Sequence, residues 1–225
     1  MNGLLREVLA LLPRPVAEQL HSLKHRLYWL TKGRRLHRHY FDTYQTRSKV
    51  IDVVNDCLDR EDRSTFHILE LGCSSANNLR LLRETVSKSI RFVGFDVQSD
   101  AIAYAKNNFS DDLFIVGDDR KLLEKASSLG RFDVFLASAV LYYVPERRCR
   151  ATLSMAAKIA DYVIICDNLS QFDSPKGICN GLFLHPYRRL CQDVGLHIVK
   201  EPIPLNLGIQ HSIFVASPFA GKRIK

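Results

Sequence analysis

The sequence predicts an α/β protein: a doubly wound, seven-stranded, mostly parallel sheet with an antiparallel last strand, preceded by an N-terminal helical extension. Seven short β-rich runs are spread over residues 66–216, and segments long enough for helices separate the first six runs. Such alternation is typical of a parallel sheet with helices on both faces. No helical segment separates the last two runs, so we expect them to pair antiparallel.

The individual elements follow from local patterns of β-branched, aromatic and turn residues. We expect strands at residues 66–71, 91–95, 113–116, 132–137, 162–166, 197–200 and 212–216. We expect helices at residues 44–58, 77–88, 100–108, 121–128, 146–160 and 187–194. We expect Gly195 to terminate the helix at residues 187–194, because glycine readily adopts the left-handed conformation that is common just after a helix.

The N-terminal extension, residues 1–43, differs in character from the main domain, residues 44–225. A short amphipathic segment at residues 4–11 precedes two prolines. Apolar residues then recur at helical intervals of four and three, which predicts a helix ending near Gly33; these residues are Val16, Leu20, Leu23, Leu27 and Leu30. Residues 1–50 hold ten Lys/Arg against three Asp/Glu, so most of the chain's net charge of +8 lies here.

Three roles are open for this basic amphipathic helix. It can pack on the main domain, or on a second subunit of a homodimer, with its basic face in solvent. It can contact a membrane surface or another anionic partner through residues 1–38. Nucleic-acid binding is the least favoured role, because no nucleic-acid motif accompanies the charge.

The remaining composition indicates an ordinary globular protein: 46% of residues are hydrophobic and 25% are charged. The six cysteines form no CxxC pair and no metal-ligand spacing, which indicates free thiols in a reducing compartment. The first thirty residues lack a signal-peptide pattern. We therefore expect a cytoplasmic protein. The basic helix also makes a peripheral position at the membrane a second expectation.

The stretch "LELGCSSANNL", residues 69–79, is the first that carries chemistry. It reads as a strand, a turn and the start of a helix, where backbone N–H groups and the positive helix end favour anionic ligand groups. Gly72 permits a sharp turn, and small residues at positions 73–76 let the backbone approach a ligand closely. Ser74 and Ala76 stand where further glycines are usual, so the loop alone is also compatible with a plain turn.

Acidic residues at two further strand ends favour a nucleotide-like ligand. Asp96 ends the second strand, 24 residues after Gly72, where a carboxylate can accept both hydroxyls of a ribose. Asp118 and Asp119 follow the third strand, where a carboxylate can accept from an exocyclic adenine amine. Each acid can also be a helix N-cap or a turn residue.

Five motifs in order resemble those of class I S-adenosylmethionine (SAM)-dependent methyltransferases, which have a Rossmann-like fold, and the resemblance covers residues 45–217. They are "ELGCSSANNL", "VGFDVQSDAIAYAKNN", "FIVGDD", "GRFDVFLASAVLYYVPE" and "YRRLCQDVGLHIV". The resemblance implies SAM as the cofactor. It also implies a set of cofactor-binding residues: Glu70, Gly72, Cys73, Ser74, Asn78, Asp96, Val97, Asp118, Asp119, Ser138 and Val140.

The resemblance implies a specific role for most of these residues. Glu70 would orient the loop, and Gly72, Cys73 and Ser74 would lie along the methionine part of the cofactor. Asp96 would hold the ribose, with Val97 beside the adenine. Asp118 would bind the adenine amine, with Asp119 next to it. Ser138 and Val140 would face the sulfonium. Two departures from the family pattern are the small residues at positions 74 and 76 and a tyrosine at 143, where many relatives have histidine.

A general base is needed only when the methyl acceptor arrives protonated, as a hydroxyl does. The candidates are His185 and Tyr143, with Tyr142 beside it. His185 can equally be a surface or cap residue, and the tyrosines can be pocket walls. No metal is expected, because the acid that metal-dependent relatives carry after the fourth strand is replaced by Ser138.

The acceptor class is narrowed but not identified. The sequence "ASAVLYY" lacks the elements of DNA-base and glutamine methyltransferases. We expect transfer to oxygen or nitrogen of a small molecule, a glycan or a lipid-linked intermediate. Two other classes stay open, namely a non-catalytic methyltransferase-like binding protein and a nicotinamide-dependent oxidoreductase.

Overall fold

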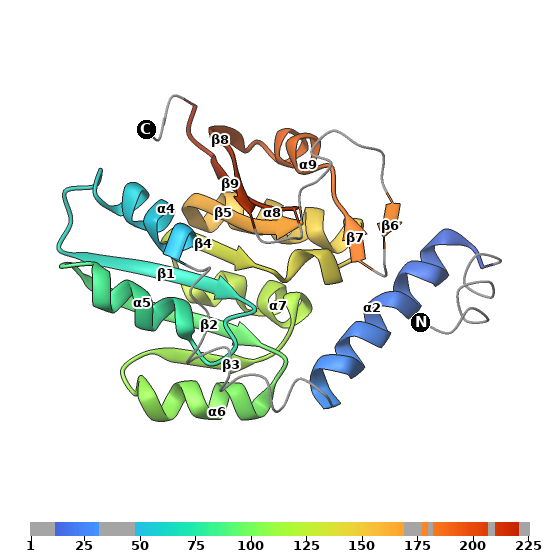
Figure 1. The fold of residues 1–225 in the computed structure, drawn as a ribbon, viewed down its shortest axis with the longest axis horizontal. Coiled ribbons are helices and arrows are strands. Elements are labelled where there is room, and N and C mark those ends of the chain that lie inside the picture. Colours follow the sequence, from blue (N-terminus) through green and yellow to red (C-terminus); the bar gives the residue numbers. More distant parts are fainter. Residues whose placement is uncertain (1–11, 32–47, 169–176, 180–181, 207–209, 221–225) are drawn as a thin grey trace.

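A seven-stranded sheet forms the centre of the computed structural model (Figure 1), which describes residues 12–31, 48–168, 177–179, 182–206 and 210–220. The strand order is β3-β2-β1-β4-β5-β9-β8. The strands are β1 Thr65–Leu71, β2 Ser89–Asp96, β3 Leu113–Val116, β4 Phe132–Ser138, β5 Ala160–Asn168, β8 His197–Asn206 and β9 Gln210–Ser217. Strands β1 to β5 run parallel, and β9 pairs antiparallel with both β5 and β8. The predicted sheet is confirmed.

Strand β1 lies at the point where the strand order reverses. It pairs with β2 on one side and with β4 on the other, both in parallel register. The connections from these neighbours therefore leave on opposite faces of the sheet, and a crevice opens outside the carboxyl ends of the strands. This topology places the loop after β1 at the centre of the expected ligand site.

Helices cover both faces of the sheet. They are α4 Ser48–Leu58, α5 Asn77–Thr85, α6 Ser99–Asn108, α7 Asp119–Leu129, α8 Glu146–Ile159 and α9 Tyr187–Asp193. One buried apolar cluster includes residues of α4, α5 and α6, and a second includes residues of α7, α8 and α9. Ile68 belongs to the first cluster and Leu69 to the second. Because neighbouring strand residues point to opposite faces, the two clusters lie on either side of the sheet.

Helix α2 (Arg14–Thr31) lies on the side of the sheet toward which β1 points (Figure 1). The rings of His25 and Trp29 contact Tyr143, in the 3₁₀ turn η3 (Leu141–Tyr143). The helix thus packs on the main domain, as one of the predicted roles requires. The apolar residues at positions 16, 20, 23, 27 and 30 do not make this contact and are exposed.

An amphipathic helix is expected to pack through its apolar side, but α2 packs on the domain through a different side. Here the polar and aromatic side faces the domain, because Arg148 and Asp118 on the domain offer it a hydrogen bond and an ion pair. The apolar side is left facing outward. The physical consequence is an exposed aliphatic stripe on an otherwise docked helix.

Smaller differences from the predicted elements have local causes. The hairpin of β6 (Gly177–Cys179) and β7 (Leu182–Leu184) was not predicted, because three-residue strands leave no periodic signal. Helix α5 ends before residue 88, since Val86 turns to an extended conformation. Gly195 ends α9 as predicted: its φ is +78°, and its N–H donates to the carbonyl oxygen of Gln192.

Several predictions fall outside the described residues. These are the helical segment at residues 4–11, the start of the helix predicted at 44–58, the stop at Gly33 and the boundary between residues 43 and 44. The division into an extension and a main domain therefore stays a prediction. Of the helices that the structure describes, none combines the length and the hydropathy needed to cross a membrane.

Candidate active site

A cavity of about 680 Å³ lies where strands β1 to β5 end and α2 passes over them. The loop after β1, the turns after β2 and β3, and the segment after β4 form one wall. Residues of α2 form the opposite wall. A cavity of this size at the switch point of a doubly wound sheet is where small ligands bind.

The loop after β1 is fixed by its own backbone. The N–H groups of Gly72 and Cys73 both donate to the carbonyl oxygen of Phe95, at 2.7 and 3.0 Å. Gly72, Ser74 and Ala76 have φ values of +79°, +50° and +65°. Residues other than glycine rarely adopt this left-handed conformation. The loop therefore keeps the shape of a glycine-rich turn although two of its three left-handed positions carry a Cβ atom.

The carboxylate of Asp96, at the end of β2, joins two turns of the cavity wall. Its Oδ2 accepts a hydrogen bond from the N–H of Ser74 and its Oδ1 accepts one from the N–H of Gln98, each at 2.9 Å. A carboxylate oxygen can accept more than one hydrogen bond. Because Asp96 also lines the cavity, it can accept from hydroxyl groups of a ligand while the backbone fixes its position.

Asp118, after β3, is engaged with the protein itself. It caps α7 by accepting from the N–H groups of Arg120 and Lys121. Its Oδ2 lies 2.7 Å from the Arg120 guanidinium and 3.9 Å from Arg26 of α2. Burial raises the pKa of this carboxyl, but the hydrogen bond and charge of Arg120 outweigh burial and hold the pKa below its usual range. The N-cap alternative considered for Asp118 is thus realised.

Asp119, the next residue, is buried and only partly paired. Its Oδ1 lies 3.2 Å from Arg148, whereas its Oδ2 has no hydrogen-bond partner among the described residues. Burial raises the pKa of this carboxyl, and the charge of Arg148 offsets part of the rise. Asp119 lines the cavity, so its Oδ2 is available to accept from an amine of a ligand.

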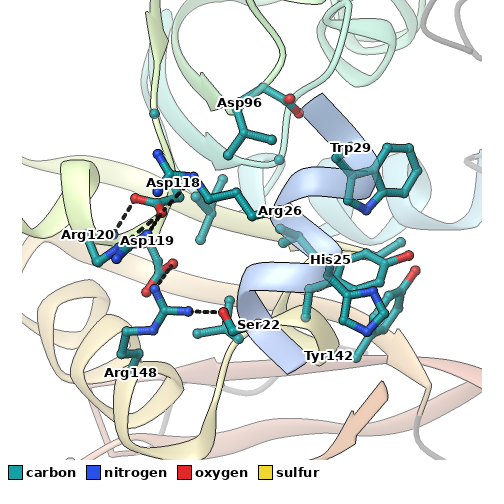
Figure 2. Close-up of a pocket in the computed structure, with 18 of the residues that line it drawn as sticks. Ser22, His25, Arg26, Trp29, Asp96, Asp118, Asp119, Arg120, Tyr142 and Arg148 are labelled. Carbon is teal, nitrogen blue, oxygen red and sulfur yellow. Dashed lines mark hydrogen bonds and ion pairs between the residues drawn. The ribbon is translucent and has the colours of Figure 1, made fainter. Parts of the chain in front are cut away.

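The wall formed by α2 is held by side chains (Figure 2). The Oγ of Ser22 accepts a hydrogen bond from Arg148 at 2.5 Å. The rings of His25 and Trp29 lie 4.8 and 5.8 Å from the ring of Tyr143. Figure 2 shows Ser22 directed toward Arg148, whereas the rings of His25 and Trp29 are directed away from Arg148. The helix thus closes the cavity through the hydrogen bond to Arg148, the ion pair of Arg26 with Asp118 and the ring contacts to Tyr143.

A protein-family model described as a methyltransferase domain matches residues 62–180, more than half of the chain. The chain belongs to this methyltransferase family. The predicted membership and the predicted enzyme class are confirmed. The match favours methyl transfer over the nicotinamide-dependent alternative. A search by sequence among curated proteins finds no match.

Solved methyltransferase structures share the fold. Magnesium protoporphyrin IX methyltransferase of Synechocystis PCC 6803, with bound SAM, is 16% identical with a TM-score of 0.65, covering 88% of this chain and 96% of that chain. Burkholderia thailandensis 1,6-didemethyltoxoflavin-N1-methyltransferase, with 1,6-didemethyltoxoflavin and S-adenosylhomocysteine, is 13% identical with a TM-score of 0.66, covering 92% and 91%. A TehB-like SAM-dependent methyltransferase of Corynebacterium glutamicum is 19% identical, with a TM-score of 0.57, covering 86% and 98%. Such identities show the fold alone.

The methyltransferase brings most of the predicted cofactor-binding residues to one cavity. Those that line it are Gly72, Ser74, Asp96, Val97, Asp118, Asp119, Ser138 and Val140. They come from four successive strand ends, as the parallel topology requires. Gly72 is packed so closely that a Cβ atom there would lie 2.9 Å from the Cβ of Val140.

Three predicted residues lie behind this wall and do not line the cavity. Glu70 and Asn78 are buried and joined by a hydrogen bond of 2.6 Å, which ties the strand to the start of α5. The Sγ of Cys73 is turned toward Gly94, where a Cβ atom would lie 2.6 Å from it. These residues can support the loop, but their side chains do not reach a ligand in the cavity.

The two predicted candidates for a general base are separated by the structure. Tyr143 lines the cavity, but His185 does not and is buried. The Nε2 of His185 lies 3.0 Å from the carbonyl oxygen of Leu141, and burial lowers the pKa of the ring. The surface position considered for His185 is wrong, because only 4% of its surface is exposed, and the N-cap of α9 is Pro186.

Several residues that line the cavity were not predicted from the sequence. They are Ser22, His25, Arg26 and Trp29 of α2, and Gln98 and Arg148 of the main domain. The one signal for the α2 residues is that Trp29, the chain's single tryptophan, lies off the apolar stripe. In Gln98, a buried residue, Oε1 has no hydrogen-bond partner within the described part of the chain.

The acidic residue near the end of β5 is engaged with α9. Asp167 is buried and accepts a hydrogen bond from the hydroxyl of Tyr187. Burial, followed by the charge of Asp167, raises the pKa of Tyr187 well above its usual value.

Across the described ranges, no group of three or more His, Cys, Asp and Glu side chains could hold a metal ion.

Proposed function

We propose that the protein transfers a methyl group from SAM to an oxygen or nitrogen atom of a small-molecule, glycan or lipid-linked acceptor bound beneath α2, without a metal. The observation that carries the proposal is the Asp96 carboxylate, which faces the cavity at the switch point while two backbone N–H groups fix it. Structures with this fold contain SAM or S-adenosylhomocysteine, which supports SAM as the cofactor.

The residues present fit that cofactor. SAM carries ribose hydroxyls and amine donors, and the cavity wall offers acceptors for them. Gln98 Oε1 and Asp119 Oδ2 are buried acceptors with no partner in the described part of the chain, and unpaired buried acceptors favour binding of a donor. The carboxylate of Asp96 is the proposed acceptor for the ribose hydroxyls. Because Asp118 is committed to α7 and Arg120, Asp119 is the better acceptor for the adenine amine.

The remaining wall can hold the other parts of the cofactor. Gly72 and Ser74 line the methionine side, Val97 lies beside the expected adenine position, and Ser138 and Val140 border the reacting end. When bound, SAM supplies a methyl group already activated by its sulfonium. The task of the protein is therefore to align the acceptor with that methyl group and to exclude water. Helix α2 covers the cavity and can do both.

His25 is the better candidate for a proton acceptor than His185. His25 lines the cavity, and its ring lies 4.8 Å from that of Tyr143, which also lines it. An imidazole in this position can take the proton of a hydroxyl acceptor as the new bond forms. An acceptor that arrives as a neutral amine needs no such base before transfer, so the role of His25 depends on the acceptor atom.

Titration calorimetry of the full chain with SAM, S-adenosylhomocysteine and NAD tests the cofactor. We expect both sulfur ligands to bind with dissociation constants of roughly micromolar order, and NAD to bind at least about tenfold more weakly. Tighter binding of NAD, or no binding of either sulfur ligand, contradicts the proposal. Incubation of extracts with methyl-labelled SAM, followed by aqueous and organic extraction, then shows the acceptor class.

A cytoplasmic location is part of the same proposal. The five described cysteines whose thiols are free are all buried, which is compatible with a reducing compartment. Localisation of a tagged full chain by fractionation checks this. Recovery in an oxidising compartment would contradict it.

A further inference from the structure

The outward face of α2 is an aliphatic stripe, defined here by Val16, Leu20, Leu23, Leu27 and Leu30. Each of these side chains is between 37% and 51% exposed. Their spacing of four and three residues places them along one line of the helix. Five exposed aliphatic side chains in a continuous row form a patch of the kind that marks an interaction surface.

Leu23 alone among the stripe residues lines the cavity, and the observed contacts of α2 hold the others away from it. Ser22, His25 and Trp29 are engaged with Arg148 and Tyr143 on the opposite side of the helix. At 100° per residue, that side lies roughly half a turn away from the stripe. The same contacts that close the cavity therefore hold the stripe outward.

The charges around the stripe favour an anionic surface as its occupant. By helical position, Lys24 lies on one flank of the stripe and Arg26, which also pairs with Asp118 at 3.9 Å, lies on the other. Within α2, three Lys/Arg stand against one acid, Glu18, and the sequence of residues 32–38 adds four Lys/Arg and no acid. A second copy of this chain would bring like charges together, whereas anionic lipid headgroups attract clustered cations and accept aliphatic side chains beneath them.

The position of α2 links this surface to the cavity. Leu23 belongs to the stripe and also lines the cavity. We propose that α2 docks on an anionic membrane surface through the stripe, so that the cavity opens beside the bilayer and receives a membrane-resident, amphiphilic acceptor. The second half of this proposal rests on the proposed methyl transfer. The docking itself does not.

Flotation of the full chain with lipid vesicles tests the docking. We expect binding to vesicles of phosphatidylcholine with phosphatidylglycerol, weak binding to phosphatidylcholine alone, and loss of much of the binding at about 0.5 M salt. The stripe variant Leu20→Glu/Leu27→Glu should reduce the partition onto anionic vesicles at least about tenfold. Neither of these leucines lines the cavity.

The matched control is Leu113→Glu/Phe219→Glu, which adds the same charge at side chains that are 48% and 46% exposed outside α2. This variant should bind vesicles as the unmodified chain does. A third variant, Leu20→Ser/Leu27→Ser, removes apolar surface without adding charge and should also weaken binding. An equal loss in the control, or no binding of the unmodified chain, overturns the docking.

Two further readouts separate membrane docking from dimerisation and from damage to the cavity. Light scattering reports whether the stripe joins two copies: a dimer that the stripe variant dissociates, with no vesicle binding, overturns the proposal. Calorimetry with SAM on the stripe variant should match the unmodified chain. Vesicle binding without SAM binding would refute the methyl-transfer proposal and leave the docking intact.

Discussion

The two walls of the cavity are built in different ways. The strand-end wall is fixed by backbone N–H groups, those of Gly72, Cys73, Ser74 and Gln98, which donate to acceptors on or beside β2. The α2 wall is fixed by side chains, through one hydrogen bond to Arg148, one ion pair of Arg26 with Asp118 and ring contacts to Tyr143. The comparison indicates a preorganised binding surface opposed by a cover that depends on few atoms.

Replacement of Arg148 should have the largest effect, because this one guanidinium contacts both Ser22 of α2 and the buried carboxylate of Asp119. In Arg148→Met a buried charge loses its partner, which costs about 3–5 kcal/mol of unfolding free energy. Urea unfolding followed by circular dichroism measures this. The control Arg131→Met, which breaks a more exposed pair with Asp161, should cost less than about 1 kcal/mol. Equal losses would show that α2 and Asp119 do not depend on Arg148.

The cost of Arg148→Met should depend on pH. Burial raises the pKa of Asp119 above its unfolded value. At pH values between the unfolded and the folded pKa, the folded state binds a proton that the unfolded chain has lost, so stability falls over this interval as the pH rises. Removing Arg148, whose charge lowers this pKa, extends the interval upward. The difference in unfolding free energy between variant and unmodified chain should therefore be smaller at about pH 5 than at about pH 7. A constant difference contradicts this account.

Replacement of Asp96 tests the backbone-fixed wall. Asp96→Ala removes the acceptor for Ser74 and Gln98 and the proposed acceptor for the ribose, so the dissociation constant for SAM should rise about 100-fold, or about 2.7 kcal/mol. The matched control is Asp112→Ala. Asp112 accepts the N–H of Phe92 on the same strand but does not line the cavity, and its loss should leave SAM binding within about threefold. Unchanged affinity in Asp96→Ala would remove the support for SAM at this wall.

The smallest expected effect concerns the shape of the loop. Ser74 has a left-handed φ of +50°, so Ser74→Gly should raise the unfolding free energy by about 0.5–1 kcal/mol. Ser75, its neighbour, has no positive φ, and Ser75→Gly should lower it by a similar amount, about 0.5–1 kcal/mol. Thermal unfolding resolves the two directions. A loss of stability in Ser74→Gly would mean that its side chain contributes more than its conformation costs.

The difference between the strand-end wall and the α2 wall also decides how much of the site could be predicted from the sequence. Gly72, Asp96 and Asp118 follow successive strands, and each strand, turn and helix start leaves a local pattern. Parallel topology then brings these strand ends together without further information. The sheet, its antiparallel last strand and the strand-end wall were predictable for this reason.

The α2 wall was not predictable in this way. Ser22 and Arg148 are 126 positions apart, and no local pattern encodes a contact over that separation. The apolar spacing of α2 correctly predicted the helix but not which side packs on the domain. His185 follows the unpredicted hairpin of β6 and β7, so the direction of its ring could not be derived from the sequence.

The bridging position of Asp96 makes two amides available as spectroscopic reporters. The N–H groups of Ser74 and Gln98 end on different oxygens of one carboxylate. Any hydroxyl that binds this carboxylate withdraws electron density from both oxygens and therefore weakens and lengthens both hydrogen bonds. In a proton–nitrogen correlation spectrum the two amide signals should therefore move together during a ligand titration, although they belong to different turns.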